Sequence, residues 1–346
     1  MKLIRIAILV VIGINSLKGQ TKSINESSYL LIGGIEQWVT IRGNDISKPV
    51  ILFLHGGPGS TMSQFENTMY GSWEDDFILV NWDQRGAGRT YGRNAPSKLD
   101  EKYIQNTPLT VDRMTRDGIE LSQYLISHLK KDKIILVGTS WGSILGMEML
   151  LKKPELFKAY LGHSQVVNPS ESFKCAYEKT RELSQLAKDS VSLKKLKSLG
   201  KPPYKNARST GQLLRIVKKY ERANSTPAPN NWFKIASEYD NEIDAKSRYD
   251  GDDYSFCYFA GFEKIGIKSM VLGIDYKRSG LNIKIPIYLI QGEQDILTPK
   301  ELTKPYFDSI TAPLKKYILL PNAAHGHNQA VVDAQFKIAE QITHSK

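Results

Sequence analysis

A serine lies between two glycines in residues 138–142 (Gly-Thr-Ser-Trp-Gly), which follow the apolar run 133–137 and precede a helical pattern. A Gly-x-Ser-x-Gly turn between a strand and a helix presents the serine hydroxyl as a nucleophile above a sheet. The turn is sharp, so residues beside the serine must lack side chains that would strike neighbouring backbone. The alternative is an ordinary turn in which Ser140 caps the helix. The flanking strand and helix favour a catalytic Ser140.

A second motif, residues 55–59 (His-Gly-Gly-Pro-Gly), ends the apolar run 50–55. Its glycines allow backbone amides to approach a ligand closely. In acyl transfer, such a loop supplies one donor of the oxyanion hole, and the residue after the nucleophile supplies the other. This assigns the amides of Gly57 and Trp141 to the oxyanion hole. A phosphate-binding loop is the alternative, but no Gly-Lys-Ser/Thr sequence follows.

A third motif, residues 83–90 (Asp-Gln-Arg-Gly-Ala-Gly-Arg-Thr), follows the apolar run 77–83. Together the three motifs resemble those of the proline iminopeptidase-like serine peptidases of the α/β-hydrolase superfamily. The usual strings there are His-Gly-Gly-Pro-Gly, Asp-Gln-Arg-Gly-x-Gly-x-Ser and Gly-Gly-Ser-Trp-Gly. The first matches completely, whereas Thr90 and Thr139 replace a serine and a glycine of the others. The resemblance covers about residues 30–165 and 285–345.

Within this resemblance, Asp83 and Arg85 are interpreted as structural residues that hold the loop beside the oxyanion hole. The superfamily order of the remaining groups is serine, acid, histidine. The loop 291–295 (Gln-Gly-Glu-Gln-Asp) matches the Gly-x-x-Asp pattern of the superfamily at Asp295, with Glu293 as the rival acid.

Residues 321–328 (Pro-Asn-Ala-Ala-His-Gly-His-Asn) contain two histidines. His325 stands where the family has Gly-His, with Ala324 in place of the glycine, and His327 is the fallback. A His-x-His metal pair is the alternative, but the two histidines lack neighbouring cysteine or carboxylate ligands, so we expect no metal site. We expect no cofactor either. In the expected mechanism His325 takes the proton of Ser140, Asp295 orients the imidazole, and water hydrolyses the acyl-enzyme.

The resemblance implies release of an N-terminal residue, often proline, from small peptides. A substrate ammonium group needs carboxylate partners because an unpaired buried charge is costly. The acidic part of the region after residue 220, residues 221–255, holds 8 Asp+Glu against 4 Lys+Arg, and Glu238 and Glu242 are the candidates within it. A solvated face is the alternative for these carboxylates, which also include Asp240, Asp244, Asp250, Asp252 and Asp253. No Trp-x-x-Trp-Glu segment of the well-studied iminopeptidases is found, so a carboxylesterase or amidase with the same triad stays open. A non-catalytic binding protein on this fold is the remote alternative. A serine at residue 140 argues against dehalogenase or epoxide hydrolase chemistry.

The elements that must position these residues alternate between short apolar runs and helical patterns, which predicts an α/β fold. We expect the α/β-hydrolase architecture, a mostly parallel eight-stranded sheet with helices on both faces. Residues 168–283 break the alternation and predict a helical cap inserted between core segments 25–167 and 284–346. Predicted strands lie at residues 29–32, 37–41, 50–55, 77–83, 133–137, 159–163, 287–291 and 316–320, and predicted helices at about 110–130, 141–153, 299–310 and 328–343.

The 346 residues carry a net charge of +11. The excess lies mainly in residues 170–220, with 13 Lys+Arg against 4 Asp+Glu, which is most simply a solvated surface. No nucleic-acid-binding motif is found, and the expected partner is a small peptide, ester or amide substrate. A mean hydropathy of −0.34 excludes a polytopic membrane protein. The oligomeric state does not follow from the sequence.

Two basic residues precede an apolar run at residues 6–14, and small residues follow. This pattern is typical of a secretory signal peptide, predicted over residues 1–19, and the run is too short to span a bilayer. A first β-strand and an uncleaved anchor are the alternatives. We therefore expect an exported protein, periplasmic or secreted, without stable membrane insertion after cleavage. In an oxidising compartment Cys175 and Cys257 could pair, and two separate thiols are the alternative.

Overall fold

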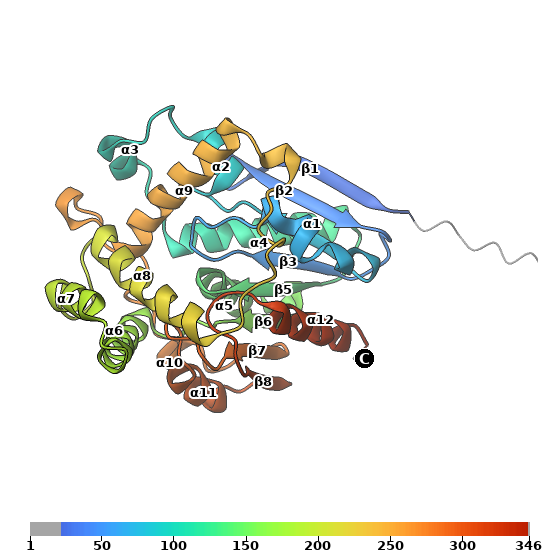
Figure 1. Ribbon diagram of the computed structural model, residues 1–346. Coiled ribbons are helices and arrows are strands. Elements are labelled where there is room, and N and C mark those ends of the chain that lie inside the picture. Colours follow the sequence, from blue (N-terminus) through green and yellow to red (C-terminus); the bar gives the residue numbers. More distant parts are fainter. Residues whose placement is uncertain (1–21, 345–346) are drawn as a thin grey trace, which may run out of the picture.

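The computed structural model describes residues 22–344, so the predicted signal peptide lies outside the described residues. Eight strands form one sheet in the order β1-β2-β4-β3-β5-β6-β7-β8, with helices on both of its faces (Figure 1). All eight predicted strands are confirmed. Their bounds are β1 Ile24–Ile32, β2 Ile35–Gly43, β3 Val50–Leu54, β4 Ile78–Trp82, β5 Ile134–Thr139, β6 Phe157–His163, β7 Ile287–Gly292 and β8 Lys315–Leu320.

The sheet is mostly parallel, as predicted. The hairpin β1–β2 and the pair β2–β4 are antiparallel, and every pair from β4 across to β8 is parallel. Every residue of β3 and β4 is buried, as expected for strands covered on both faces. Because the strands from β4 to β8 are parallel, their carboxyl ends lie at the same edge of the sheet. Loops from distant parts of the sequence converge at this edge.

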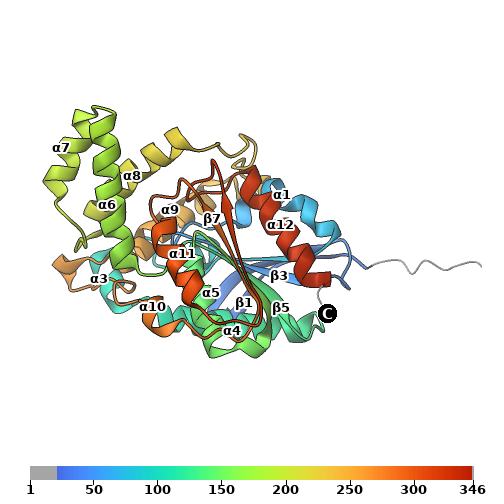
Figure 2. The same ribbon diagram turned by 90° about the horizontal axis from the view of Figure 1, so that it is seen from below.

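The helices pack on the sheet according to the alternation of side chains along each strand. On β3, Leu52 and Leu54 join the apolar core that contains α4 and α5, whereas Ile51 and Phe53 join the core under α12. Figure 2 shows α4 and α12 on opposite sides of the sheet. The helices are α1 Glu66–Met69, α2 Gly88–Asn94, α3 Glu101–Asn106, α4 Val111–His128, α5 Trp141–Lys152, α6 Pro169–Leu186, α7 Ser190–Leu199, α8 Ala207–Asn224, α9 Glu242–Ala260, α10 Tyr276–Ser279, α11 Lys300–Ser309 and α12 Gln329–His344.

Helices α6 to α10 lie in sequence between β6 and β7, in the region predicted to be helical. Each of these five helices begins with a polar side chain that accepts a hydrogen bond from a backbone amide of the first turn. An apolar cluster joins α6, α7 and α8 and also contains Ile296 from the loop after β7. The five capping residues are Asn168, Asp189, Asn206, Asn241 and Asp275.

Arg89, at the start of α2, anchors this helical insertion to the sheet. Its guanidinium lies 4.6 Å from the ring centre of Trp38 and 4.0 Å from that of Tyr239. Its Nε and Nη2 donate to the two carboxylate oxygens of Asp244, at 2.8 and 2.7 Å. The stacked and bidentate geometry suits arginine and not lysine. This side chain is one of the contacts that fix α9 to the core, and Ser255 of α9 adds another by donating to the carbonyl of Gly86 at 2.7 Å.

The insertion also contains both cysteines of the chain. Cys175 lies on α6 and Cys257 on α9, and both are free thiols. The disulfide considered from the sequence is therefore absent, and the alternative of two separate, half-buried thiols is the one observed. Within residues 22–344, the helices are too short or too polar to cross a membrane.

Candidate active site

Ser140 occupies the sharp turn between β5 and α5. Its backbone has φ 54° and ψ −119°, a conformation that is strained for a residue with a side chain. The close approach explains both glycines. A Cβ at Gly138 would lie 2.6 Å from the carbonyl oxygen of Gly142, and a Cβ at Gly142 would lie 2.6 Å from the carbonyl carbon of Leu54. The turn therefore holds the hydroxyl of Ser140 at the carboxyl edge of the sheet.

The structure brings the three residues predicted to act together into one chain of hydrogen bonds. His325, in the loop between β8 and α12, has Nε2 2.8 Å from Oγ of Ser140. Its Nδ1 lies 3.1 and 3.2 Å from the two carboxylate oxygens of Asp295, in the loop between β7 and α11. Both loops follow parallel strands, so the sheet itself sets their meeting point (Figure 1). This arrangement suits proton transfer from the serine to the imidazole.

The surroundings of Asp295 keep its carboxylate ionised. Burial raises the pKa of Asp295, but the charge of His325 and hydrogen bonds from His325 and Thr298 outweigh burial and lower it. Thr298 donates from both its amide and its hydroxyl, each at 2.7 Å. Burial lowers the pKa of His325, and the opposite charge of Asp295 outweighs burial and raises it. The pair thus favours an imidazolium stabilised by a carboxylate.

The two rival residues lie elsewhere. Glu293 forms an ion pair with Lys300 at 2.9 Å and is partly exposed to solvent. His327 packs against His163, with ring centres 4.9 Å apart, and burial together with the charge of His325 lowers its pKa to about 4. Asp295 and His325 are therefore the residues that the structure connects to Ser140.

The His-Gly-Gly-Pro-Gly loop lies directly against the serine. A Cβ at Gly56 would lie 3.4 Å from the Cβ of Ser140. Gly57 has a φ of +110°, and a Cβ there would lie 2.5 Å from the amide nitrogens of the two residues that follow Pro58. Trp141 is the first residue of α5, and the first amides of a helix have no partner within the helix. The predicted donors Gly57 and Trp141 thus lie on the two segments that meet at Ser140.

Gln84 joins these two segments, a role that the sequence motif did not reveal. Its Nε2 donates to the carbonyl of His55 at 3.1 Å, and its Oε1 accepts from Nε1 of Trp141 at 2.9 Å. Its backbone amide donates to Nε2 of His55 at 3.2 Å. Burial lowers the pKa of His55 to about 4, so the imidazole is neutral and accepts this bond. Gln84 and His55 therefore fix residues 55–59, which we call the oxyanion loop after their predicted role, relative to α5.

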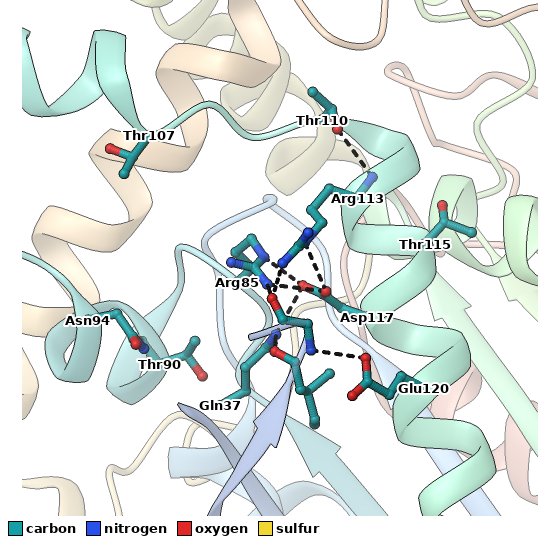
Figure 3. Close-up of polar contacts among 12 residues, drawn as sticks. Gln37, Arg85, Thr90, Asn94, Thr107, Thr110, Arg113, Thr115, Asp117 and Glu120 are labelled. Carbon is teal, nitrogen blue, oxygen red and sulfur yellow. Dashed lines mark hydrogen bonds and ion pairs between the residues drawn. The ribbon is translucent and has the colours of Figure 1, made fainter. Parts of the chain in front are cut away.

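The flanking residues of the same motif make structural contacts. Asp83 accepts from Oγ of Ser63 at 2.7 Å and from the amide of Arg89 at 2.8 Å, and burial raises its pKa to about 7. Arg85 donates to the buried carboxylate of Asp117 at 2.6 Å and to the carbonyl of Gly33 at 2.9 Å (Figure 3). These bonds connect the motif to α4 and to the β1–β2 turn, as expected for structural residues.

A family model for the α/β hydrolase fold matches residues 49–327, most of the chain. The chain belongs to the α/β-hydrolase family. It is 31% identical to the probable aminopeptidase YbaC of Bacillus subtilis, over 88% of this chain and 92% of that protein. It is 25% identical to the proline iminopeptidase of Flavobacterium johnsoniae, over 85% of this chain and 89% of that protein. Within this family, the α/β hydrolase described here is proline iminopeptidase-like. It is therefore an enzyme.

The structural comparison agrees with this family. The crystal structure of the proline iminopeptidase of Mycobacterium smegmatis superposes with a TM-score of 0.61 at 16% identity. The superposition covers 92% of the α/β hydrolase described here and 98% of that chain. At this level of identity the likeness concerns the fold alone.

The carboxylates of the insertion lie at different depths in the α/β hydrolase. Glu238 forms an ion pair with Arg42 at 3.5 Å, and Glu242 is exposed at the beginning of α9. Asp252 lies further along α9, about 15 Å from Glu242 at 1.5 Å per residue. Its amide nitrogen would lie 2.9 Å from a Cβ at Gly59, so α9 packs directly on the oxyanion loop. Asp252 is thus the α9 carboxylate that the structure brings to this loop.

A second carboxylate, Glu221 of α8, is buried near Asp295. Neither Asp252 nor Glu221 stands in a recognisable motif. The only signal in the sequence was that Asp252 belongs to the acidic part of the insertion. The structure was needed to distinguish Asp252, which packs against Gly59, and the buried Glu221 from the other carboxylates of the insertion.

Proposed function

We propose that the enzyme is a serine hydrolase in which Ser140, His325 and Asp295 form the catalytic triad. The observation that carries this proposal is the strained Ser140, whose Oγ lies 2.8 Å from His325 Nε2. An N-capping serine would point its hydroxyl at the amides of its own helix. The hydroxyl here meets an imidazole that a carboxylate holds from the other side.

The reaction follows from the groups in place. His325 takes the proton as Oγ of Ser140 attacks a carbonyl carbon, and the amides of Gly57 and Trp141 stabilise the oxyanion. Each such donor contributes roughly 3–4 kcal/mol in comparable sites. The protonated His325 then gives its proton to the leaving group, and water releases the acyl group by the same steps in reverse order.

We infer that the substrate is a small peptide from which an N-terminal residue is released. The names of the curated relatives support an aminopeptidase, and the position of Asp252 supports recognition of an ammonium group. Ser60, directly after the oxyanion loop, donates to Oδ1 of Asp252 at 3.3 Å. Burial raises the pKa of Asp252 although its side chain keeps contact with solvent. A substrate ammonium group would relieve this cost, so Asp252 replaces Glu238 and Glu242 as the proposed partner.

The test is a panel of substrates with one reporter group. Proline and alanine p-nitroanilides, their N-acetylated forms and p-nitrophenyl acetate are compared on the wild-type enzyme and on Ser140→Ala. If the enzyme is an aminopeptidase, the wild type hydrolyses the free-amine anilides but not their N-acetylated forms. The Ser140→Ala variant hydrolyses neither. Turnover of the ester alone would make the enzyme a carboxylesterase. A folded protein that a fluorophosphonate does not label at Ser140 would be a non-catalytic binding protein.

The helical insertion and the N-terminus complete the proposal. We infer that α6 to α10 form a cap over the site, because α9 packs on the oxyanion loop and α8 approaches Asp295. We also propose export, on the basis of the basic and apolar pattern of residues 1–19. Expression with the full N-terminus, fractionation and N-terminal sequencing test it. A cytosolic protein that begins at Met1 would rule out export.

A further inference from the structure

Glu221 connects the insertion to the loop of the triad acid. It lies near the end of α8 and is only 6% exposed. Its Oε1 accepts a hydrogen bond of 2.8 Å from the amide of Ile296, the residue that follows Asp295. The amide of Leu297 lies close enough to lower the pKa of the same carboxylate. A side chain of the insertion therefore binds the loop of the core that follows Asp295.

Apolar packing supports the same junction. Ile296 is 7% exposed and belongs to the apolar cluster of the insertion, together with Tyr220 and Val217 of α8. The loop of Asp295 is thus held to α8 by side-chain packing as well as by a hydrogen bond. On its other side, Thr298 binds the carboxylate of Asp295 itself. Asp295 is therefore held directly by Thr298 of the core, and its loop is held by Glu221 of the insertion.

The charges at this junction are close enough to influence one another. Burial and the negative charge of Asp295 raise the pKa of Glu221 to about 7, although the charge of His325 opposes this effect. The charge of Glu221 in turn raises the pKa of His325, and Lys218 of the same helix lowers it. His163, from β6, is neutral because burial holds its pKa well below the usual value.

We propose that Glu221 is a positioning residue of the active site. Its hydrogen bond to the amide of Ile296 holds Asp295 at the correct distance from His325, and its charge adds to that of Asp295 in favouring the imidazolium. This proposal rests on the proposed triad. It assigns to the insertion a part in the chemical step, separate from the recognition of substrate proposed for Asp252.

The experiment compares Glu221→Gln and Glu221→Ala, with Glu182→Gln as the matched control. Glu182, on α6, is an exposed carboxylate of the same insertion that pairs with Lys179. Each variant is assayed from pH 5 to 9 on a free-amine p-nitroanilide and on p-nitrophenyl acetate. Circular dichroism and thermal melting establish which variants fold.

We expect Glu221→Ala to lose about 10- to 100-fold in kcat on both substrates with little change in KM, because misplacement of a catalytic group lowers the rate of the chemical step. Glu221→Gln keeps an acceptor for the amide of Ile296 and should recover most of that loss at pH 8. Without the negative charge, the pKa of His325 falls, so the acid limb of kcat/KM should move to lower pH by about half a unit. Glu182→Gln should match the wild type.

Three results would overturn the proposal. The first is wild-type kinetics and a wild-type pH profile in both variants. The second is a change confined to a higher KM for the free-amine substrate. The third is a decrease in kcat that is equal in Glu221→Gln and Glu221→Ala, without a shift in the pH profile. If Glu221→Ala fails to fold, the pH profile of Glu221→Gln decides alone. Residual activity in Ser140→Ala would instead contradict the triad, so the two failures are distinguishable.

Discussion

The second glycine of the serine turn offers a sharp test of the site geometry. A Cβ at Gly142 would lie 2.6 Å from the carbonyl carbon of Leu54 and 2.8 Å from the carbonyl oxygen of His55. Carbon atoms in contact prefer about 3.5–4.0 Å, so Gly142→Ala must separate β3 from α5 by about 1 Å. Both neighbours are backbone groups, which cannot rotate away as a side chain would.

This displacement falls on the entry to the oxyanion loop, because His55 is the first residue of that motif. Overpacking of this kind costs about 1–3 kcal/mol of unfolding free energy, or a few degrees in Tm. A displacement of 1 Å at the reacting groups costs about 100-fold in rate. We therefore expect a folded Gly142→Ala enzyme with kcat reduced by about two orders of magnitude.

The assay is kcat on an activated ester, which needs little substrate recognition, together with Tm by calorimetry. The matched control is Gly273→Ala, because a Cβ there meets open space and the backbone is not in the left-handed region. A Gly142→Ala enzyme with wild-type kcat and Tm would refute the reasoning, since the structure leaves no room for the methyl group. A loss of Tm without any loss of kcat would show that the loop tolerates the displacement.

Three further variants test other parts of the structure. Asp295→Asn should lower kcat by about 10⁴-fold near neutral pH, measured on the ester, because the imidazole of His325 loses the carboxylate that orients it and stabilises its charge. An unchanged rate would contradict the assignment of the acid. Arg89→Ala should lower the unfolding free energy by about 2–3 kcal/mol in urea titrations, since it leaves Asp244 partly buried without its partner. Arg89→Lys should restore only part of this loss. His327 has a pKa of about 4 in the folded state and about 6.5 when unfolded, so only the unfolded state gains its proton between these values. Stability should therefore fall as pH drops from 6.5 towards 4, by up to about 1.4 kcal/mol per pH unit for this group, and His327→Phe should reduce the slope.

Much of the fold could be predicted because its elements are local in sequence. The central strands are short, nearly continuous apolar runs, as expected for strands buried on both faces. The turn at Ser140 could be predicted because its two glycines lie within five residues of sequence. Each is required because a Cβ there would clash with neighbouring backbone atoms. The choice of His325 over His327 depended on a family pattern, and the distances to Ser140 agree with it.

The parts that escaped prediction depend on contacts between distant segments. Gln84 acts through residues 55 and 141, and Glu221 through residue 296, so neither has a local pattern. The carboxylates chosen from the acidic run were Glu238 and Glu242. Only the docking of α9 on Gly59 distinguishes Asp252 from them, and this contact has no signal in the spacing of the sequence.

The position of the insertion also has a consequence for folding. Strands β6 and β7 are neighbours in the sheet, yet more than 120 residues separate them in the sequence. Closing a loop of that length costs about 4 kcal/mol of chain entropy before the pairing forms. We expect the segment up to β6 to collapse first and β7 and β8 to dock late, since contacts of long sequence separation form slowly. Asp295 and His325 lie in the loops that follow these last strands. A folding intermediate without β7 and β8 would therefore have Ser140 in its turn but would lack the two residues that bind it.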